Sequence, residues 1–275
     1  MSDTSAATPG GPVAGATVDV STPDGTVEAF VAKPTEAHGL LPGVLFFIDA
    51  FGLRDRTRRM VEEIASWGYI VMAPNVFHRL GSIDDLDLGD LTDDEHREAI
   101  FGDAMSRVGT LTDEIAERDL PAYLDALQSL PGVADGPVAV TGYCMGGRLA
   151  FLAAALRPDD VAAVALFHTG RLVTDEPNSP HLRAGDLTAT VLAVHADHDR
   201  SMPPEAIAQF EHALADAGVP HSTSVYPGAP HGYTMADLPA YNADADTHHF
   251  TELRTLLDDT LRPDSGDPDP PEPAG

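Results

Sequence analysis

The chain has 275 residues, of which 43% are hydrophobic, so it is long and apolar enough for one large α/β domain with a proper core. A formal net charge of −28 argues against nucleic acids and anionic membranes as partners, because both attract basic surfaces. A single cysteine excludes an internal disulfide, and no apolar run approaches the length of a membrane span, so we expect a cytoplasmic protein. The many negative charges discourage association, so we expect a monomer or a homodimer.

Hydrophobic patterning predicts strands that alternate with helices, beginning with a β-hairpin around a Pro-Asp-Gly turn at 23–25. This alternation indicates an α/β fold with a mostly parallel central sheet and helices on both faces. One domain is expected at 16–262, between disordered tails at 1–15 and 263–275, and the first tail lacks a secretory signal. The expected strands are 17–21, 27–32, 44–48, 69–73, 138–141, 161–167, 189–194 and 222–225, and the expected helices are 54–67, 115–130, 149–156, 203–217 and 246–261.

A long segment at 75–114 interrupts this alternation and carries several acidic clusters. Long segments without regular structure are uncommon inside compact domains unless they have a function. We therefore expect a functional loop or lid there.

The stretch Gly-Tyr-Cys-Met-Gly-Gly at 142–147 joins an apolar run to a helix-like segment. Glycines two residues either side of Cys144 are typical of a nucleophile elbow, in which a strained turn presents the nucleophile at the tip of a sheet. The N-terminus of the following helix favours a thiolate and later an oxyanion. The alternative is a buried and inert cysteine.

Polar residues follow several of the expected strands, where sites form in open α/β sheets. A nucleophile needs a base, and the base needs an orienting acid, in the chain order nucleophile, acid, histidine. Cys144, Asp199 and His231 satisfy that order, although Asp197 competes with Asp199 on chemistry alone. His168 and Arg171 follow another strand and are candidates for the pocket wall.

These motifs resemble those of the dienelactone hydrolase family, a branch of the α/β hydrolases with a cysteine nucleophile, over residues 17–261. The matching pieces are the elbow and the segments 49–52, 196–203 and 226–233. The resemblance implies an α/β-hydrolase fold, with Asp199 as the acid because it precedes a Val-Pro-like pair.

The same resemblance implies further roles at the end of the third expected strand. Family members carry a Glu there that contacts and activates the thiol, and Asp49 takes its place in this chain. The backbone N–H groups of Ala50 and Met145 are expected to form the oxyanion hole. In well-known members, arginines bind a carboxylate of the substrate. In this chain Met235 stands at one of these positions and Arg97 matches another, so a neutral ester is also a candidate substrate.

The expected activity is therefore hydrolysis of a carboxylic ester or lactone through a thioester on Cys144, without a metal or organic cofactor. Two alternatives remain. The His-Ala-Asp-His-Asp run at 195–199 resembles a metal cluster superficially. The fold also suits a non-catalytic or redox-sensing binding protein in which Cys144 is oxidised.

Overall fold

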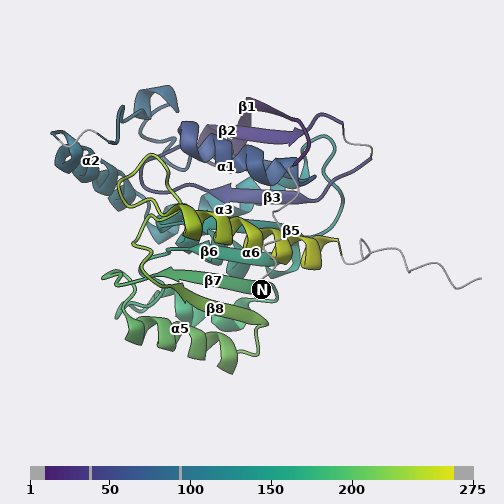
Figure 1. The fold of residues 1–275 in the computed structure, drawn as a ribbon. Helices are drawn as coiled ribbons and strands as arrows, with labels where there is room; N and C mark the ends of the chain where they lie inside the picture. The colour runs from purple at the N-terminus through teal and green to yellow at the C-terminus, as the bar shows by residue number, and fades with distance from the viewer. Residues whose placement is uncertain (1–9, 37–38, 93–94, 263–275) are drawn as a thin grey trace, which may run out of the picture.

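A computed structural model describes residues 10–36, 39–92 and 95–262, and Figure 1 shows one twisted sheet between two layers of helices. Eight strands form this sheet in the order β1-β2-β4-β3-β5-β6-β7-β8. Their bounds are β1 Val13–Thr22, β2 Gly25–Pro34, β3 Gly43–Phe47, β4 Ile70–Pro74, β5 Val138–Tyr143, β6 Val161–Phe167, β7 Thr190–Ala196 and β8 His221–Tyr226.

Most of the sheet is parallel, as predicted. The hairpin partners β1 and β2 are antiparallel, and β2 pairs antiparallel with β4, whereas every pair from β4 to β8 is parallel. All five residues of β3 are buried, which explains its uninterrupted apolar sequence, because helices cover both faces of a parallel sheet.

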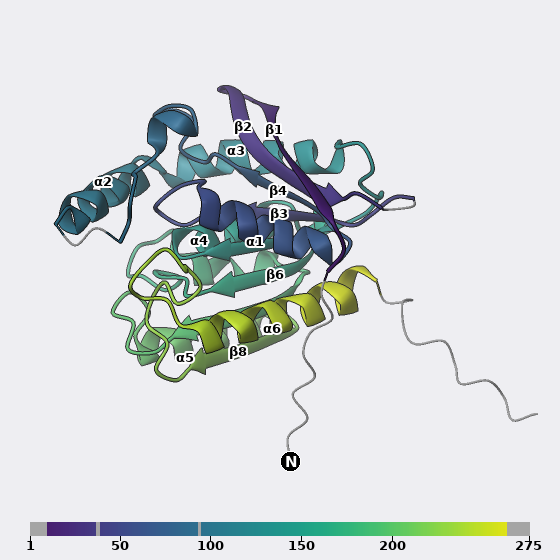
Figure 2. The ribbon, with the colours of Figure 1, turned by 45° about the horizontal axis from the view of Figure 1, so that its top comes forward.

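Helices lie on both faces of the sheet, which confirms the predicted architecture. In Figure 2, α1 and α6 cover one face, and α3 and α4 lie behind the sheet with α5 toward its β8 edge. The bounds of the helices are α1 Asp55–Ser66, α2 Arg97–Thr110, α3 Asp113–Gln128, α4 Met145–Leu156, α5 Pro204–Asp216 and α6 Ala243–Leu261, with short 3₁₀ helices at η1 Asp84–Leu86, η2 Pro158–Asp160 and η3 Pro180–Asp186.

The predicted start of the domain differs from the structure. The first strand begins at Val13, so residues 13–15 pair with β2 instead of belonging to a disordered tail. The rest of the predicted tails, 1–9 and 263–275, lies outside the described residues.

The segment at 75–114 is more regular than predicted, since it contains η1 and the 14-residue helix α2. Figures 1 and 2 both show α2 projecting beyond the layered body. Phe101 is 54% exposed on this helix, and Gly102 and Gly109 interrupt its apolar pattern. A helix that buries little surface leaves only a weak periodic signal in its sequence.

No helix in the described part of the chain combines the length and apolar character of a membrane span.

Candidate active site

The turn between β5 and α4 holds Cys144 in an unusual backbone conformation, with φ 55° and ψ −120°. Its N–H donates to the Phe167 carbonyl of the neighbouring strand at 3.1 Å. A Cβ at Gly142 would collide with the Gly146 carbonyl, and a Cβ at Gly146 would collide with the Ile48 carbonyl. These two glycines let strand and helix close around the cysteine, as the sequence motif predicts.

Cys144, His231 and Asp199 form one continuous chain of hydrogen bonds. The Cys144 Sγ lies 3.1 Å from His231 Nε2, and His231 Nδ1 lies 2.6 Å from Asp199 Oδ2. The other carboxylate oxygen of Asp199 accepts bonds from the Ser201 N–H and hydroxyl at 2.8 and 2.7 Å. Because β5, β7 and β8 are parallel, the segments that follow them meet at the same edge of the sheet.

The other polar residues of the run 195–199, which were alternatives as triad acid or metal ligands, each have a different environment. Asp197 accepts the Gly228 N–H at 2.8 Å, and His198 is exposed. His195 is buried with its ring 6.3 Å from that of Phe210. The described residues contain no group of three side chains able to hold a metal ion. The run therefore has the arrangement of a strand end and turn, in which only Asp199 reaches His231.

Charges around the imidazole hold it protonated. Burial disfavours the charged ring, but hydrogen bonds with Asp199 and Cys144 and their negative charges raise the pKa of His231 to about 10. Burial also opposes the Asp199 carboxylate, yet bonds from His231 and Ser201 lower its pKa to about 2. At neutral pH the arrangement is an imidazolium held between a carboxylate and a sulfur.

Replacing Cys144 with alanine removes the hydrogen bond and the charge interaction through which Cys144 raises the pKa of His231, so that pKa should fall. An NMR titration of the histidine rings in both proteins measures this change. His195, whose pKa burial lowers to about 4, serves as an internal control because it does not touch Cys144. An unchanged His231 titration would show that Cys144 does not contribute to the raised pKa of His231.

The predicted oxyanion donors are the backbone N–H groups of Ala50, in the loop after β3, and of Met145, which directly follows Cys144. Among the described residues, neither the Ala50 N–H nor the Met145 N–H has an acceptor, and Met145 begins α4, where free N–H groups are expected. The start of α4 packs on the end of β3, because Gly146 directly meets the Ile48 carbonyl. The predicted oxyanion donors therefore belong to segments in contact.

Asp49 is engaged differently from the prediction. Its side chain is 3% exposed, and both carboxylate oxygens accept bonds from Arg54 at 2.7 and 3.0 Å. Oδ1 also accepts the Phe51 N–H at 3.0 Å. No hydrogen bond joins Asp49 to Cys144 in the described part of the chain, so the structure shows no contact of the thiol-activating kind.

A hollow of about 290 Å³ opens beside Cys144, and Asp49, His168 and His231 also line it. Its remaining wall is largely apolar. It comes from the loop after β3, from the segment at 75–114 for which the sequence predicts a functional loop, and from residues 238–240, which no sequence motif indicates. Helix α2 would have been hard to assign to this wall, because its amphipathic pattern is weak. The apolar lining residues are Phe51, Leu91, Ile100, Phe101, Leu238, Pro239 and Ala240.

The three residues predicted to line the pocket differ in where the structure places them. His168 lies in the wall, with Nε2 2.8 Å from the Thr234 hydroxyl, and complete burial holds its pKa well below the usual range, so its ring is neutral. Arg171 is exposed and lines a different hollow with Arg148. Arg97 is the first residue of α2, and its side chain is outside the described residues.

Comparisons with known proteins agree with this architecture. The model of the dienelactone hydrolase family matches residues 27–261. A protein of Escherichia coli K12, provisionally named a carboxymethylenebutenolidase, is 30% identical over 78% of this chain and 76% of its own. The carboxymethylenebutenolidase of Rhodococcus opacus is 29% identical over 69% of each chain.

A crystal structure from Klebsiella pneumoniae, of a protein provisionally named a dienelactone hydrolase, shares the fold. Its TM-score is 0.76, it is 23% identical, and the match covers 90% of this chain and 98% of that one. The predicted fold class is thereby confirmed.

Proposed function

Because the chain belongs to the dienelactone hydrolase family, we propose that it hydrolyses carboxylic esters or lactones with Cys144 as the nucleophile. The observation that carries this proposal is the hydrogen-bonded series Cys144, His231, Asp199 at a nucleophile elbow. A nucleophile, a base and an orienting acid in hydrogen-bond reach are the requirements of covalent acyl transfer.

In the first half of the reaction, the Cys144 thiolate attacks the ester carbonyl carbon. The N–H groups of Ala50 and Met145 stabilise the negative oxygen that forms. The tetrahedral intermediate collapses by breaking the C–O bond, and the His231 imidazolium gives its proton to the leaving alcohol oxygen. The products are a thioester on Cys144 and a neutral imidazole.

In the second half, neutral His231 takes a proton from water, and the resulting hydroxide attacks the thioester carbon. The C–S bond breaks, which returns the electron pair to sulfur and releases the carboxylic acid. Asp199 holds the imidazole in the tautomer that presents Nε2 to the reacting atoms, and its charge stabilises the imidazolium in each half. These steps require no metal or organic cofactor.

The pocket favours a small, neutral and apolar substrate. Asp49 is the one acidic residue among the described lining side chains, and no described lysine or arginine faces the hollow. The Arg54 guanidinium that neutralises Asp49 lines a different cavity. The one cation among the described lining residues, the His231 imidazolium, is already paired with Asp199 and Cys144. A substrate carboxylate would therefore lose its water in this pocket without gaining a cationic partner of its own, which is costly.

We expect the protein to hydrolyse methyl 4-acetoxybenzoate faster than 4-acetoxybenzoate by roughly 100-fold, after correction for their rates with hydroxide. Both esters release a phenol, so absorbance follows both reactions. Prior treatment with iodoacetamide should abolish turnover, since the chain has one cysteine. Failure to hydrolyse either ester while Cys144 still becomes alkylated would contradict the proposed activity and favour the redox-sensing alternative.

A matched pair of variants tests the apolar wall. Phe101→Arg places a cation in the pocket lining and should reduce the preference for the neutral ester. Met105→Arg adds the same charge to an exposed position on the same helix but outside that lining, so the preference should stay as in the wild type. An equal effect of both variants would show that overall charge, rather than the pocket wall, sets the preference.

A further inference from the structure

The guanidinium of Arg54 lies beside the candidate site, because it binds Asp49 in the lining of the hollow at Cys144. Its side chain is 13% exposed. It binds Asp49 at 2.7 and 3.0 Å, Asp237 at 2.6 and 3.1 Å, and the Gly52 carbonyl at 3.2 Å. A guanidinium has five N–H donors, and all of them are used here. Planar, bidentate geometry of this kind makes strong and directional ion pairs.

This cluster joins segments that are far apart in the sequence. Asp49 and Gly52 belong to the loop that leaves β3, and Asp237 lies 183 positions beyond Arg54 in the segment that follows His231. Arg56 adds a second connection, because it donates to the Thr234 carbonyl at 2.9 Å. The start of α1 therefore holds the β3 loop and the segment after His231 in a fixed relation.

We propose that Arg54 is a positioning residue for the oxyanion hole, an inference that rests on the proposed hydrolase function. Asp49 Oδ1 accepts one bond from Arg54 and one from the Phe51 N–H. The carboxylate thereby fixes the turn whose middle residue is Ala50. With both oxygens occupied, Asp49 acts as the anchor of this turn and not as a proton acceptor for Cys144.

The cluster of Arg54, Asp49 and Asp237, which we call the clamp, depends on the positive charge of the guanidinium. Asp49 is almost completely buried, and the Asp237 side chain is 30% exposed. Without the guanidinium between them, the two carboxylates would lose their shared counterion, and Asp49 would be a buried charge without an ion-pair partner. The turn would then relax toward water and move the Ala50 N–H away from the position that the oxyanion occupies.

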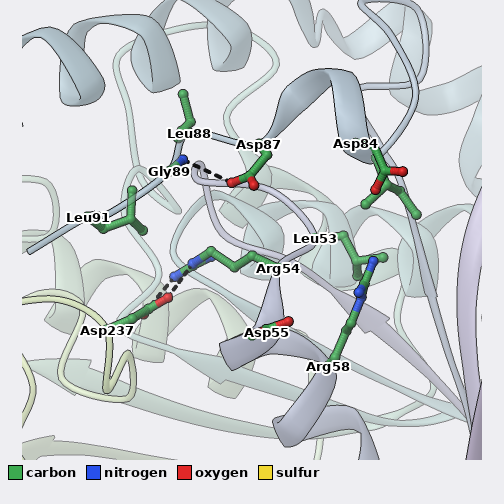
Figure 3. Close-up of a pocket in the computed structure, with 11 residues that line it drawn as sticks. Leu53, Arg54, Asp55, Arg58, Asp84, Asp87, Leu88, Gly89, Leu91 and Asp237 are labelled. Atoms are coloured by element: carbon green, nitrogen blue, oxygen red, sulfur yellow. Dashed lines mark hydrogen bonds and ion pairs between the residues drawn. The ribbon is translucent and has the colours of Figure 1, made fainter.

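A cavity next to the clamp allows a direct test. Figure 3 shows Arg54 meeting Asp237 at one side of this cavity, which measures about 310 Å³, with Arg58 and Asp84 across from it. In a variant without the Arg54 side chain, we expect an exogenous guanidinium ion to reach the two carboxylates through this cavity. Arg58 lines the same cavity but binds no carboxylate in the described part of the chain, and it contacts the Phe30 ring instead.

We expect Arg54→Ala to lower kcat by about 100-fold, the size of effect seen when an oxyanion donor is lost, with KM unchanged. Millimolar guanidinium should raise kcat in this variant and leave the wild type unaffected. Arg58→Ala is the matched control and should keep the wild-type kcat. Guanidinium rescue separates positioning from general damage, because an ion cannot repair a misfolded chain.

Asp237→Asn provides a second test in case Arg54→Ala does not fold, since it keeps the guanidinium in place and weakens only one side of the clamp. It should lower kcat below the wild-type value with KM unchanged, and iodoacetamide should label Cys144 at the wild-type rate because His231 is untouched. Wild-type kcat in a folded Arg54→Ala or in Asp237→Asn, or a loss in Arg54→Ala that guanidinium does not rescue, would overturn the inference. Absence of esterase activity in the wild type would instead contradict the proposed function.

Discussion

The Cys144→Ala variant should lose roughly 10⁴-fold or more in kcat, because the proposed reaction has no covalent path without the sulfur. Residual turnover should come only from binding and the oxyanion donors. The fold should persist, since alanine keeps the Cβ that the turn already accommodates and can adopt the same backbone conformation as cysteine. Steady-state hydrolysis of an aryl ester measures the activity, and circular dichroism with thermal unfolding measures the fold.

A direct observation of the intermediate strengthens this test. Rapid acid quenching of the wild type during turnover should trap a species heavier by one acyl group, located on Cys144 by peptide mass spectrometry. The alanine variant should show no such species. Acyl transfer to another residue, or wild-type turnover by Cys144→Ala, would exclude the proposed nucleophile.

Asp199→Asn should slow the reaction by roughly 10²–10⁴-fold, because the amide neither holds the imidazole tautomer nor stabilises the imidazolium. The hydrogen bond of 2.6 Å between Asp199 and His231 joins a carboxylate to a ring whose pKa is raised to about 10. Loss of the negative charge lowers that pKa, so the imidazolium of the variant should deprotonate at lower pH. A pH–rate profile of kcat/KM should therefore shift toward lower pH along with the drop in rate.

Asp197→Asn is the matched control, two residues away in the same loop. Asp197 accepts the Gly228 N–H, a bond that an asparagine oxygen can also accept. Its kcat should stay near the wild-type value, with at most a small change in thermal stability. A reversal, in which Asp197→Asn is inactive and Asp199→Asn is active, would assign the acid to Asp197.

Local signals predicted much of the fold. The run 44–48 is predicted as a buried strand because it is uninterruptedly apolar, and every residue of β3 is indeed buried. The elbow could be predicted because the collisions that any side chain at Gly142 or Gly146 would cause leave a visible glycine spacing. The mostly parallel sheet followed from the alternation of strands and helices, since parallel neighbours need a crossover between them.

Other features depend on contacts that no local pattern records. One of the two ion-pair partners of Arg54 is Asp237, and nothing in the sequence around either residue indicates that they meet. The prediction for Asp49 came from resemblance, and the residue finds Arg54 five positions later instead of the thiol. Helix α2 escaped prediction because it packs little of its surface on the body and therefore needs no regular apolar stripe.

The backbone at Cys144 has a consequence for the evolution and engineering of this chain. A positive φ at a residue with a Cβ costs about 1–3 kcal/mol, which the surrounding turn must hold in place. Only glycine would adopt this conformation without strain, so the most stabilising replacement at this position is also one that deletes the sulfur. Selection for thermal stability and selection for turnover oppose each other at this residue. Stability-guided redesign should therefore hold position 144 constant and seek its improvements elsewhere in the chain.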